Sequence, residues 1–190
     1  MASGLFSNKS KILMIAFLAS DAVFFAFLIT SFVFYHGSSK GGPNPWRQLD
    51  PLTTGMYSIA LWGSSGTMWL SERAIRRNKL KQVRRWLEAT LVLGALFLVG
   101  QGLEFNGLFE KSIYPRTDLF ATTFFTTTGF HGVHVLIGLV MLLILRGLLS
   151  GGFGTRDYQL EGYEAASYYW HFVDIVWIAI FFIFYVWGTR

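Results

Sequence analysis

The chain has 190 residues, of which 53% are hydrophobic, 18% aromatic and only 14% charged. Soluble domains carry roughly 25% charged residues, so this composition favours a membrane protein, folded as a single domain over residues 1–190. The absence of cysteine excludes disulfides, thiolate metal sites and a covalently attached c-type heme. The net charge of +5 is compatible with nucleic-acid binding or with basic cytoplasmic loops, which the distribution of the charges distinguishes.

Five segments meet the length of about 20 mostly apolar residues that a membrane-spanning helix needs. The first, 12–35, follows two lysines as a signal peptide would, but its apolar sequence continues well beyond Asp21, which favours an uncleaved helix. The second, 52–70, is the weakest because it is rich in Gly, Ser and Thr. The other three cover 86–109, 119–145 and 165–187. The sequence therefore predicts an all-α, integral membrane bundle of five transmembrane helices.

Lysine and arginine residues predict the orientation, because cytoplasmic loops are enriched in them. With the N-terminus in the cytoplasm and the C-terminus outside, eleven of these residues lie inside and five outside. The inside set is Lys9, Lys11, Arg73, Arg76, Arg77, Lys79, Lys81, Arg84, Arg85, Arg146 and Arg156, and the outside set is Lys40, Arg47, Lys111, Arg116 and Arg190. The basic run at 73–85 is thus expected beside anionic lipid headgroups, and no nucleic-acid partner is expected.

Ionisable residues within the spans are the candidate functional residues, because a charge at a helix centre costs roughly 2.5–3.5 kcal/mol to insert. They are Asp21, Glu104, His131, His134, His171 and Asp174. His131 and His134 are three residues apart and share a helix face, and His171 and Asp174 repeat that spacing. At about 1.5 Å per residue, Asp21, His134, His171 and Asp174 lie at similar depths and could meet in the inner half of the bundle.

Three interpretations of this polar cluster remain open. Histidines and carboxylates can bind a metal, and His134 and His171 lie at depths that suit the two axial ligands of a b-type heme. The cluster could instead handle protons or gate a substrate. The favoured interpretation is structural, with hydrogen bonds that join helices to each other, to a partner subunit or to a lipid headgroup. No catalytic residue and no metal ligand is assigned.

Small residues recur at near-helical spacing on the fourth segment. This helix-packing seam comprises Thr122, Thr126, Gly129 and Gly132. Small side chains let helix backbones approach closely in a membrane, so the seam fits either a partner subunit or a neighbouring helix of the same chain. No phosphate loop, nucleophile elbow or dinucleotide fingerprint occurs, and the inverted repeats typical of transporters are missing.

Four motifs, in this order, resemble those of one family: ASDAVFF followed by FYHGS (19–38), GQGLEF (100–105), FFTTTGFHGVHVLIGLVMLL (124–143) and EAASYYWHFVDIVWIAIFFIFYVWG (164–188). Together they resemble cytochrome c oxidase subunit III over nearly the whole chain. The resemblance is to the short five-helix bacterial form, which lacks the first two of the seven helices of the longer form. The family usually has Glu where this chain has Asp21.

This resemblance implies an accessory, non-catalytic subunit of a heme-copper terminal oxidase in a bacterial inner membrane. It implies no cofactor in this chain, heme and copper in partner subunits, bound structural phospholipid and support of proton uptake. It implies direct contact with oxidase subunit I, with subunit II and a small subunit IV as further partners, and leaves membership of a respiratory supercomplex open.

By residue-by-residue carry-over, Asp21 is the buried carboxylate near subunit I. The other polar positions of the family motifs are Glu104, His131, His134, Glu164, His171 and Asp174. Three alternatives stay open at this point: subunit III of a quinol oxidase, a stand-alone membrane b-type cytochrome, and a small proton-coupled transporter.

Overall fold

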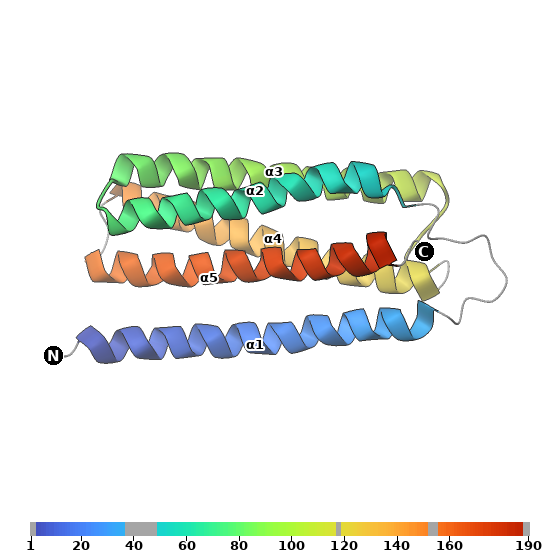
Figure 1. Cartoon of the computed structure of the whole chain (residues 1–190), viewed down its shortest axis with the longest axis horizontal. Helices are drawn as coiled ribbons and strands as arrows, with labels where there is room; N and C mark the ends of the chain where they lie inside the picture. The colour runs from blue at the N-terminus through green and yellow to red at the C-terminus, as the bar shows by residue number, and fades with distance from the viewer. Residues whose placement is uncertain (1–2, 37–48, 117–118, 152–155, 188–190) are drawn as a thin grey trace.

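The computed structural model describes residues 3–36, 49–116, 119–151 and 156–187, which form helices joined by turns, with no strand among them (Figure 1). The elements are α1 (Ser3–His36), α2 (Pro51–Arg76), α3 (Leu80–Glu110), α4 (Leu119–Gly151), α5 (Arg156–Phe181) and the π-helical segment η2 (Phe182–Trp187).

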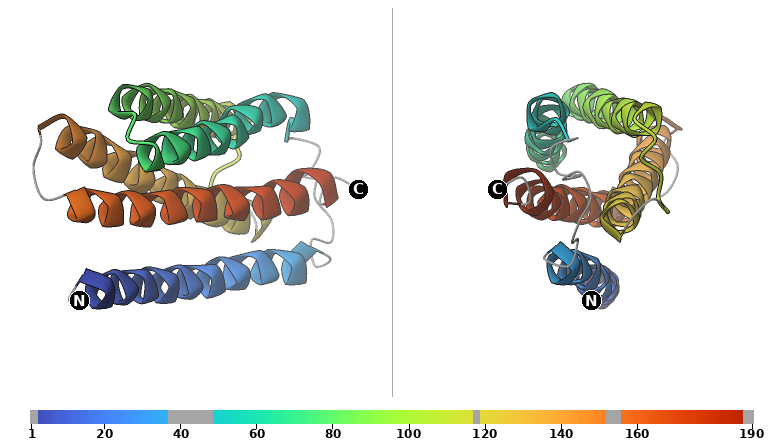
Figure 2. Two further views of the ribbon diagram at one scale, coloured as in Figure 1. Left: turned by 60° about the vertical axis from the view of Figure 1, so that its left-hand side comes forward. Right: turned by 90° about the vertical axis from the view of Figure 1, so that its right-hand side faces the viewer.

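Helices α2 to α5 form a four-helix bundle, and α1 lies beside it against α4 and α5 (Figures 1 and 2). All five run roughly along the long axis of the molecule, as helices that cross one bilayer would. The N-terminal end of α1, the α2–α3 turn and the start of α5 lie at the same end of the bundle (Figure 1).

Every predicted span coincides with a helix of the structure, and each observed helix is longer than its predicted span. The last predicted span, 165–187, falls on two elements, because α5 ends at Phe181 and the chain continues as the π-helix η2. Among the described residues, four helical stretches are apolar enough to cross a membrane: Lys11–Tyr35, Leu80–Glu110, Ala121–Leu149 and Leu160–Trp187. Helix α2 is not among them, for the compositional reason that made its segment the weakest.

Helices α2 and α3 form a tight antiparallel hairpin whose ends the sequence defines. The Asp50 carboxylate accepts the backbone N–H groups of Leu52 and Thr53 at 3.1 and 3.3 Å, and Pro51 fills the first helical position. At the other end Asn78 adopts a φ of 58°. Its N–H donates to Ile75 O and that of Lys79 to Ala74 O, a Schellman motif that ends α2 and turns the chain into α3.

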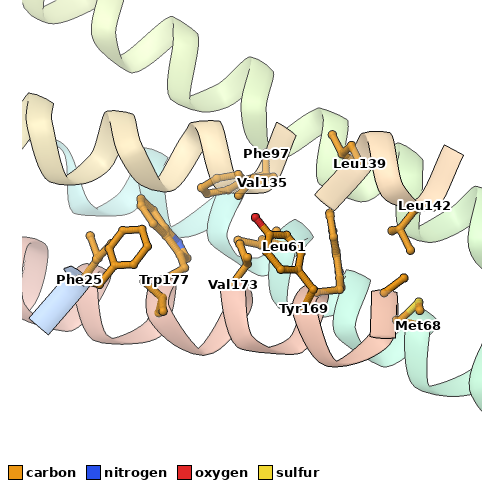
Figure 3. Packing of buried hydrophobic residues seen from close by; sticks show 14 of the residues in the cluster. Phe25, Leu61, Met68, Phe97, Val135, Leu139, Leu142, Tyr169, Val173 and Trp177 are labelled. Carbon is orange, nitrogen blue, oxygen red and sulfur yellow. The ribbon is translucent and has the colours of Figure 1, made fainter. Parts of the chain in front are cut away.

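The core draws side chains from all five helices (Figure 3). Its largest fully buried members include Trp170 and Trp177 of α5. Their indole N–H groups donate to Ser64 Oγ and Ser58 Oγ of α2, at 3.0 and 2.9 Å. The small polar residues of α2 therefore point inward, where they satisfy buried donors that lipid could not satisfy.

Helix α2 buries small polar residues together with apolar ones such as Leu61 and Met68. Its buried residues include Thr54, Ser58, Ser64 and Ser71, whereas apolar residues are exposed on its outer face. The exposed set on α2 includes Leu52, Met56, Ile59 and Trp69. An apolar exterior over a partly polar interior is the pattern that a hydrocarbon solvent favours.

Candidate functional site

Asp21 of α1 and His134 of α4 face each other in the apolar part of the structure. Asp21 Oδ2 lies 3.6 Å from His134 Nε2, and the two side chains are only 15% and 14% exposed. The edge of the Phe25 ring packs on the imidazole with 5.0 Å between centroids. Because α1 touches only α4 and α5 closely, this polar contact is one of the few specific links between α1 and the bundle.

The second nitrogen of His134 constrains the chemistry of the pair. Nδ1 lies 2.7 Å from the carbonyl oxygen of Phe130, which can only accept, so Nδ1 carries a hydrogen. Nε2 then faces Asp21 either as an acceptor or, in the imidazolium, as a donor. The 3.6 Å between Asp21 Oδ2 and Nε2 exceeds hydrogen-bonding distance, so the two groups face each other as a polar contact without a direct hydrogen bond.

His131 has a different environment from His134, although the two share a helix. Its side chain is fully buried and stacks on Trp177 with 4.8 Å between ring centroids and 23° between the planes. The rings of Phe97 and Phe25 meet it edge-on. Neither ring nitrogen has a hydrogen-bond partner among the described residues. His131 packs as one member of an aromatic cluster that joins α1, α3, α4 and α5.

His171 and Asp174 lie on the side of α5 that carries the tryptophan contacts to α2. His171 Nδ1 is 3.3 Å from Ser65 Oγ of α2. Asp174 is buried, and its Oδ1 has no hydrogen-bond partner within the described part of the chain. The structure thus pairs Asp21 with His134 and directs His171 to α2. No three His, Cys, Asp or Glu side chains of the described residues come close enough to hold a metal ion.

Glu104 forms a separate polar centre near the end of the bundle where α2 begins and α3 ends. Its Oε1 accepts the hydroxyl of Thr54 at 2.7 Å, and the Tyr185 hydroxyl lies 2.9 Å from both carboxyl oxygens. These bonds join α3 to α2 and to η2. A cavity of about 180 Å³ lies beside it, lined in part by Asp50 and Lys111.

Glu164 of α5 lies in an ion-pair cluster that connects α1, α2 and α5 at the end of the bundle where α2 ends. Its carboxylate is 2.9 Å from Lys11 Nζ of α1 and 3.7 Å from a guanidinium nitrogen of Arg76 of α2. Arg76 also pairs with Glu72 at 2.8 Å. These partly exposed pairs are screened by solvent, and they connect the end of α1 to α2 and α5.

The four residues of the predicted packing seam lie in different environments. A Cβ on Gly132 would lie 2.8 Å from Gln101 Oε1 of α3, so this glycine serves packing within the chain. A Cβ on Gly129 would meet no atom within 4 Å, so this position is open. Thr122 is exposed and its hydroxyl donates to Pro115 O at 2.6 Å, and Thr126 is half-buried.

Several residues that join helices by hydrogen bonds are not among the predicted site residues. They are Thr54, Ser58, Ser64, Ser65, Gln101 and Tyr185. Gly94, where a Cβ would lie 2.6 Å from the Trp170 ring, is not among them either. The available signal was the cluster of Ser and Thr in the second span, where polar residues need a buried partner.

The sequence profile described as cytochrome c oxidase subunit III matches residues 6–189. Two bacterial relatives, both named cytochrome c oxidase subunit 3, are 35% identical to the chain. The one from Synechocystis sp. aligns over 90% of this chain and 73% of its own length, and the one from Corynebacterium diphtheriae over 92% and 86%.

A protein of the same name from Struthio camelus is 34% identical over 93% of this chain and 69% of its own length. These names do not favour the quinol oxidase alternative. A profile match over almost every residue, relatives of this similarity and an apolar helical bundle agree with the motifs of the sequence. The chain belongs to the cytochrome c oxidase subunit III family and is an accessory subunit of a heme-copper oxidase.

Proposed function

We propose that all five helices span the plasma membrane of a bacterium, with α2 as a span that other helices cover on its polar side. At 1.5 Å per residue the 26 residues of α2 measure about 39 Å, which exceeds the roughly 30 Å of a bilayer core. The Ser and Thr side chains of α2 have partners inside the protein, and its exposed residues are apolar. Both features support insertion in spite of a modest overall hydropathy.

The N-terminus is proposed to lie in the cytoplasm and the C-terminus outside. The basic residues of the α2–α3 hairpin and Lys11 lie at the same end of the bundle, which the positive-inside rule assigns to the cytoplasm. Lys40, Arg47 and Arg190 of the predicted outside set lie outside the described residues.

Within the oxidase, this chain is proposed to bind no cofactor and to pack directly against subunit I, with subunit II, a small subunit IV and phospholipid as further contacts. The heme and copper belong to the partner subunits. Its contribution to the reaction is to stabilise the catalytic subunit and to assist proton uptake. The observation that carries the second role is the 3.6 Å contact of Asp21 with His134, which places two largely buried side chains that can each bind a proton opposite each other.

The test is Asp21→Asn in the assembled oxidase. If Asp21 holds the proton, an asparagine amide N–H can replace it as the donor to His134 Nε2, so assembly should be retained and proton uptake slowed. Asp21→Leu would leave Nε2 without a partner, at a cost of about 1–3 kcal/mol. Glu88→Gln, which removes a carboxylate paired with Arg146, is the matched control.

The readouts are the yield of complex, its heme spectrum and the rate of proton uptake during turnover. Loss of the complex with Asp21→Asn would indicate an ionised pair, and unchanged proton uptake would contradict the proton-linked role.

A further inference from the structure

The hairpin of α2 and α3 forms a pocket that none of the oxidase roles described above uses. Its volume is about 320 Å³, within the range of roughly 300–1,000 Å³ typical of small-molecule sites. Arg73 and Arg77 line it from the end of α2, and Gln82 and Arg85 line it from the start of α3. These four side chains are exposed, so a ligand can reach them from outside the bundle.

The positive charge in this pocket is not balanced within the described part of the chain. Ion pairs near this end of the bundle use Arg76 and Arg146, and none of them includes Arg73, Arg77 or Arg85. The guanidinium of Arg73 is nevertheless held in place, because it stacks 3.6 Å above the centroid of the Trp69 ring. Three guanidinium groups with no carboxylate to neutralise them favour an anion with several oxygen atoms.

The end of α2 and the start of α3 add to the preference of the pocket for an anion. The Schellman bonds satisfy the carbonyl groups of Ala74 and Ile75 at the end of α2, which reduces the negative partial charge there. Helix α3 begins at Leu80 with no side-chain hydrogen bond capping it, so the positive end of its dipole is uncompensated. The short turn through Asn78 fixes the two helix ends relative to each other, so the fold sets the backbone positions from which the arginines reach the pocket.

The apolar part of the pocket indicates the kind of anion. Leu70 and Trp86 line it beside the arginines, at the end of two helices that are proposed to cross the bilayer. Tryptophan and arginine at this position are typical of the headgroup level. We propose that this pocket binds the phosphate of an anionic phospholipid, with the acyl chains along the exposed apolar face of α2. This inference rests on the proposed membrane placement and adds a defined lipid site to it.

The test uses the intact oxidase complex, stripped of lipid by detergent washing and titrated with phosphatidylglycerol, with native mass spectrometry as the readout. The pocket variant is Arg77→Gln with Arg85→Gln. The matched control, Lys79→Gln with Lys81→Gln, removes the same charge from the same hairpin outside the pocket. One charge-assisted hydrogen bond corresponds to about a tenfold change in affinity, so the pocket variant should bind phosphatidylglycerol at least about tenfold more weakly and the control within about twofold of wild type.

Equal weakening in both variants would overturn the site, because it would show diffuse attraction to the hairpin. Displacement of the lipid by millimolar inorganic phosphate would overturn the lipid assignment in favour of free phosphate. Loss of another oxidase subunit in the pocket variant alone would assign the arginines to a protein contact instead. Failure of wild-type chain to co-purify with any oxidase subunit would contradict the accessory function and not the pocket.

Discussion

The Asp21–His134 pair and Asp50 show how differently a carboxyl group behaves in the apolar bundle and at its edge. Asp21 Oδ2 lies 3.6 Å from His134 Nε2 and has no hydrogen bond within the described chain. Asp50, at the start of α2, is exposed and accepts three hydrogen bonds from its own helix. The first arrangement suits the movement of a proton, whereas the second stabilises the ionised form of the residue.

Acid should loosen the first turn of α2. The Thr53 hydroxyl, then the Thr53 and Leu52 N–H groups, donate to the carboxylate and hold the pKa of Asp50 below its ordinary value. A depressed pKa in the folded state means that this stabilisation is present above the pKa of the unfolded chain and disappears as the pH falls through the folded one. Amide exchange at Leu52 and Thr53, relative to intrinsic rates, should therefore accelerate on acidification.

The control for this prediction is Asp50→Asn, which keeps an acceptor for the helix cap but does not titrate. Its protection at Leu52 and Thr53 should not change with pH once intrinsic rates are removed. The same acid response in the variant and in the wild-type chain would show that another group controls the turn.

At the scale of the helix, the sequence predicts which residues form each helix, but not which face of a helix meets which neighbour. The runs of apolar residues locate all five helices, because each must supply about 20 residues to a bilayer. The shared face of His131 and His134 also follows from their spacing. Their different partners do not, because these depend on how α1 and α5 pack against α4. Glu104 is a similar case, since its partner Tyr185 lies 81 residues away in the π-helical segment.

Helix α2 is the element whose composition only the structure explains. Ser58 and Ser64 accept the indole N–H groups of Trp177 and Trp170, so the residues that weaken α2 as an apolar span bind it to α5. Interhelical hydrogen bonds of this kind contribute about 1–2 kcal/mol each within a membrane protein.

The combined variant Ser58→Ala with Ser64→Ala should accordingly lower the thermal unfolding midpoint of the purified protein in detergent. It leaves two buried N–H donors without an acceptor, at a cost of about 1–2 kcal/mol per site. Ser20→Ala, on the exposed side of α1, makes the same chemical change outside the bundle and should leave the midpoint unchanged. An unchanged midpoint in the double variant would mean that the two indole hydrogen bonds do not stabilise the attachment of α2 to α5.

At the scale of the molecule, the account predicts which ends of the helices face the cytoplasm. The chain has no cysteine, so single cysteines can be introduced without a background. Lys79→Cys, in the α2–α3 hairpin, should react with an impermeant maleimide only after the membrane is opened. Glu110→Cys, at the far end of α3, should react in intact cells. The reverse pattern would place the hairpin outside and contradict the proposed orientation.

In the described part of the chain, Asp21, Glu104 and Glu164 each join two or more helices, and the exterior is largely apolar. Asp21 and Glu164 attach α1 to the bundle at two levels, and Glu104 joins helices at the opposite end. Polar contacts that hold helices together suit a subunit that supports a catalytic partner.

The most direct test of that claim is purification of the tagged chain from its native membrane in a mild detergent, followed by a visible spectrum and mass spectrometry of the bound proteins. The account predicts co-purification with oxidase subunits I and II and the absorption bands of their hemes. A chain that is folded and membrane-extracted but emerges alone and colourless, under conditions that keep the other oxidase subunits together, would contradict it.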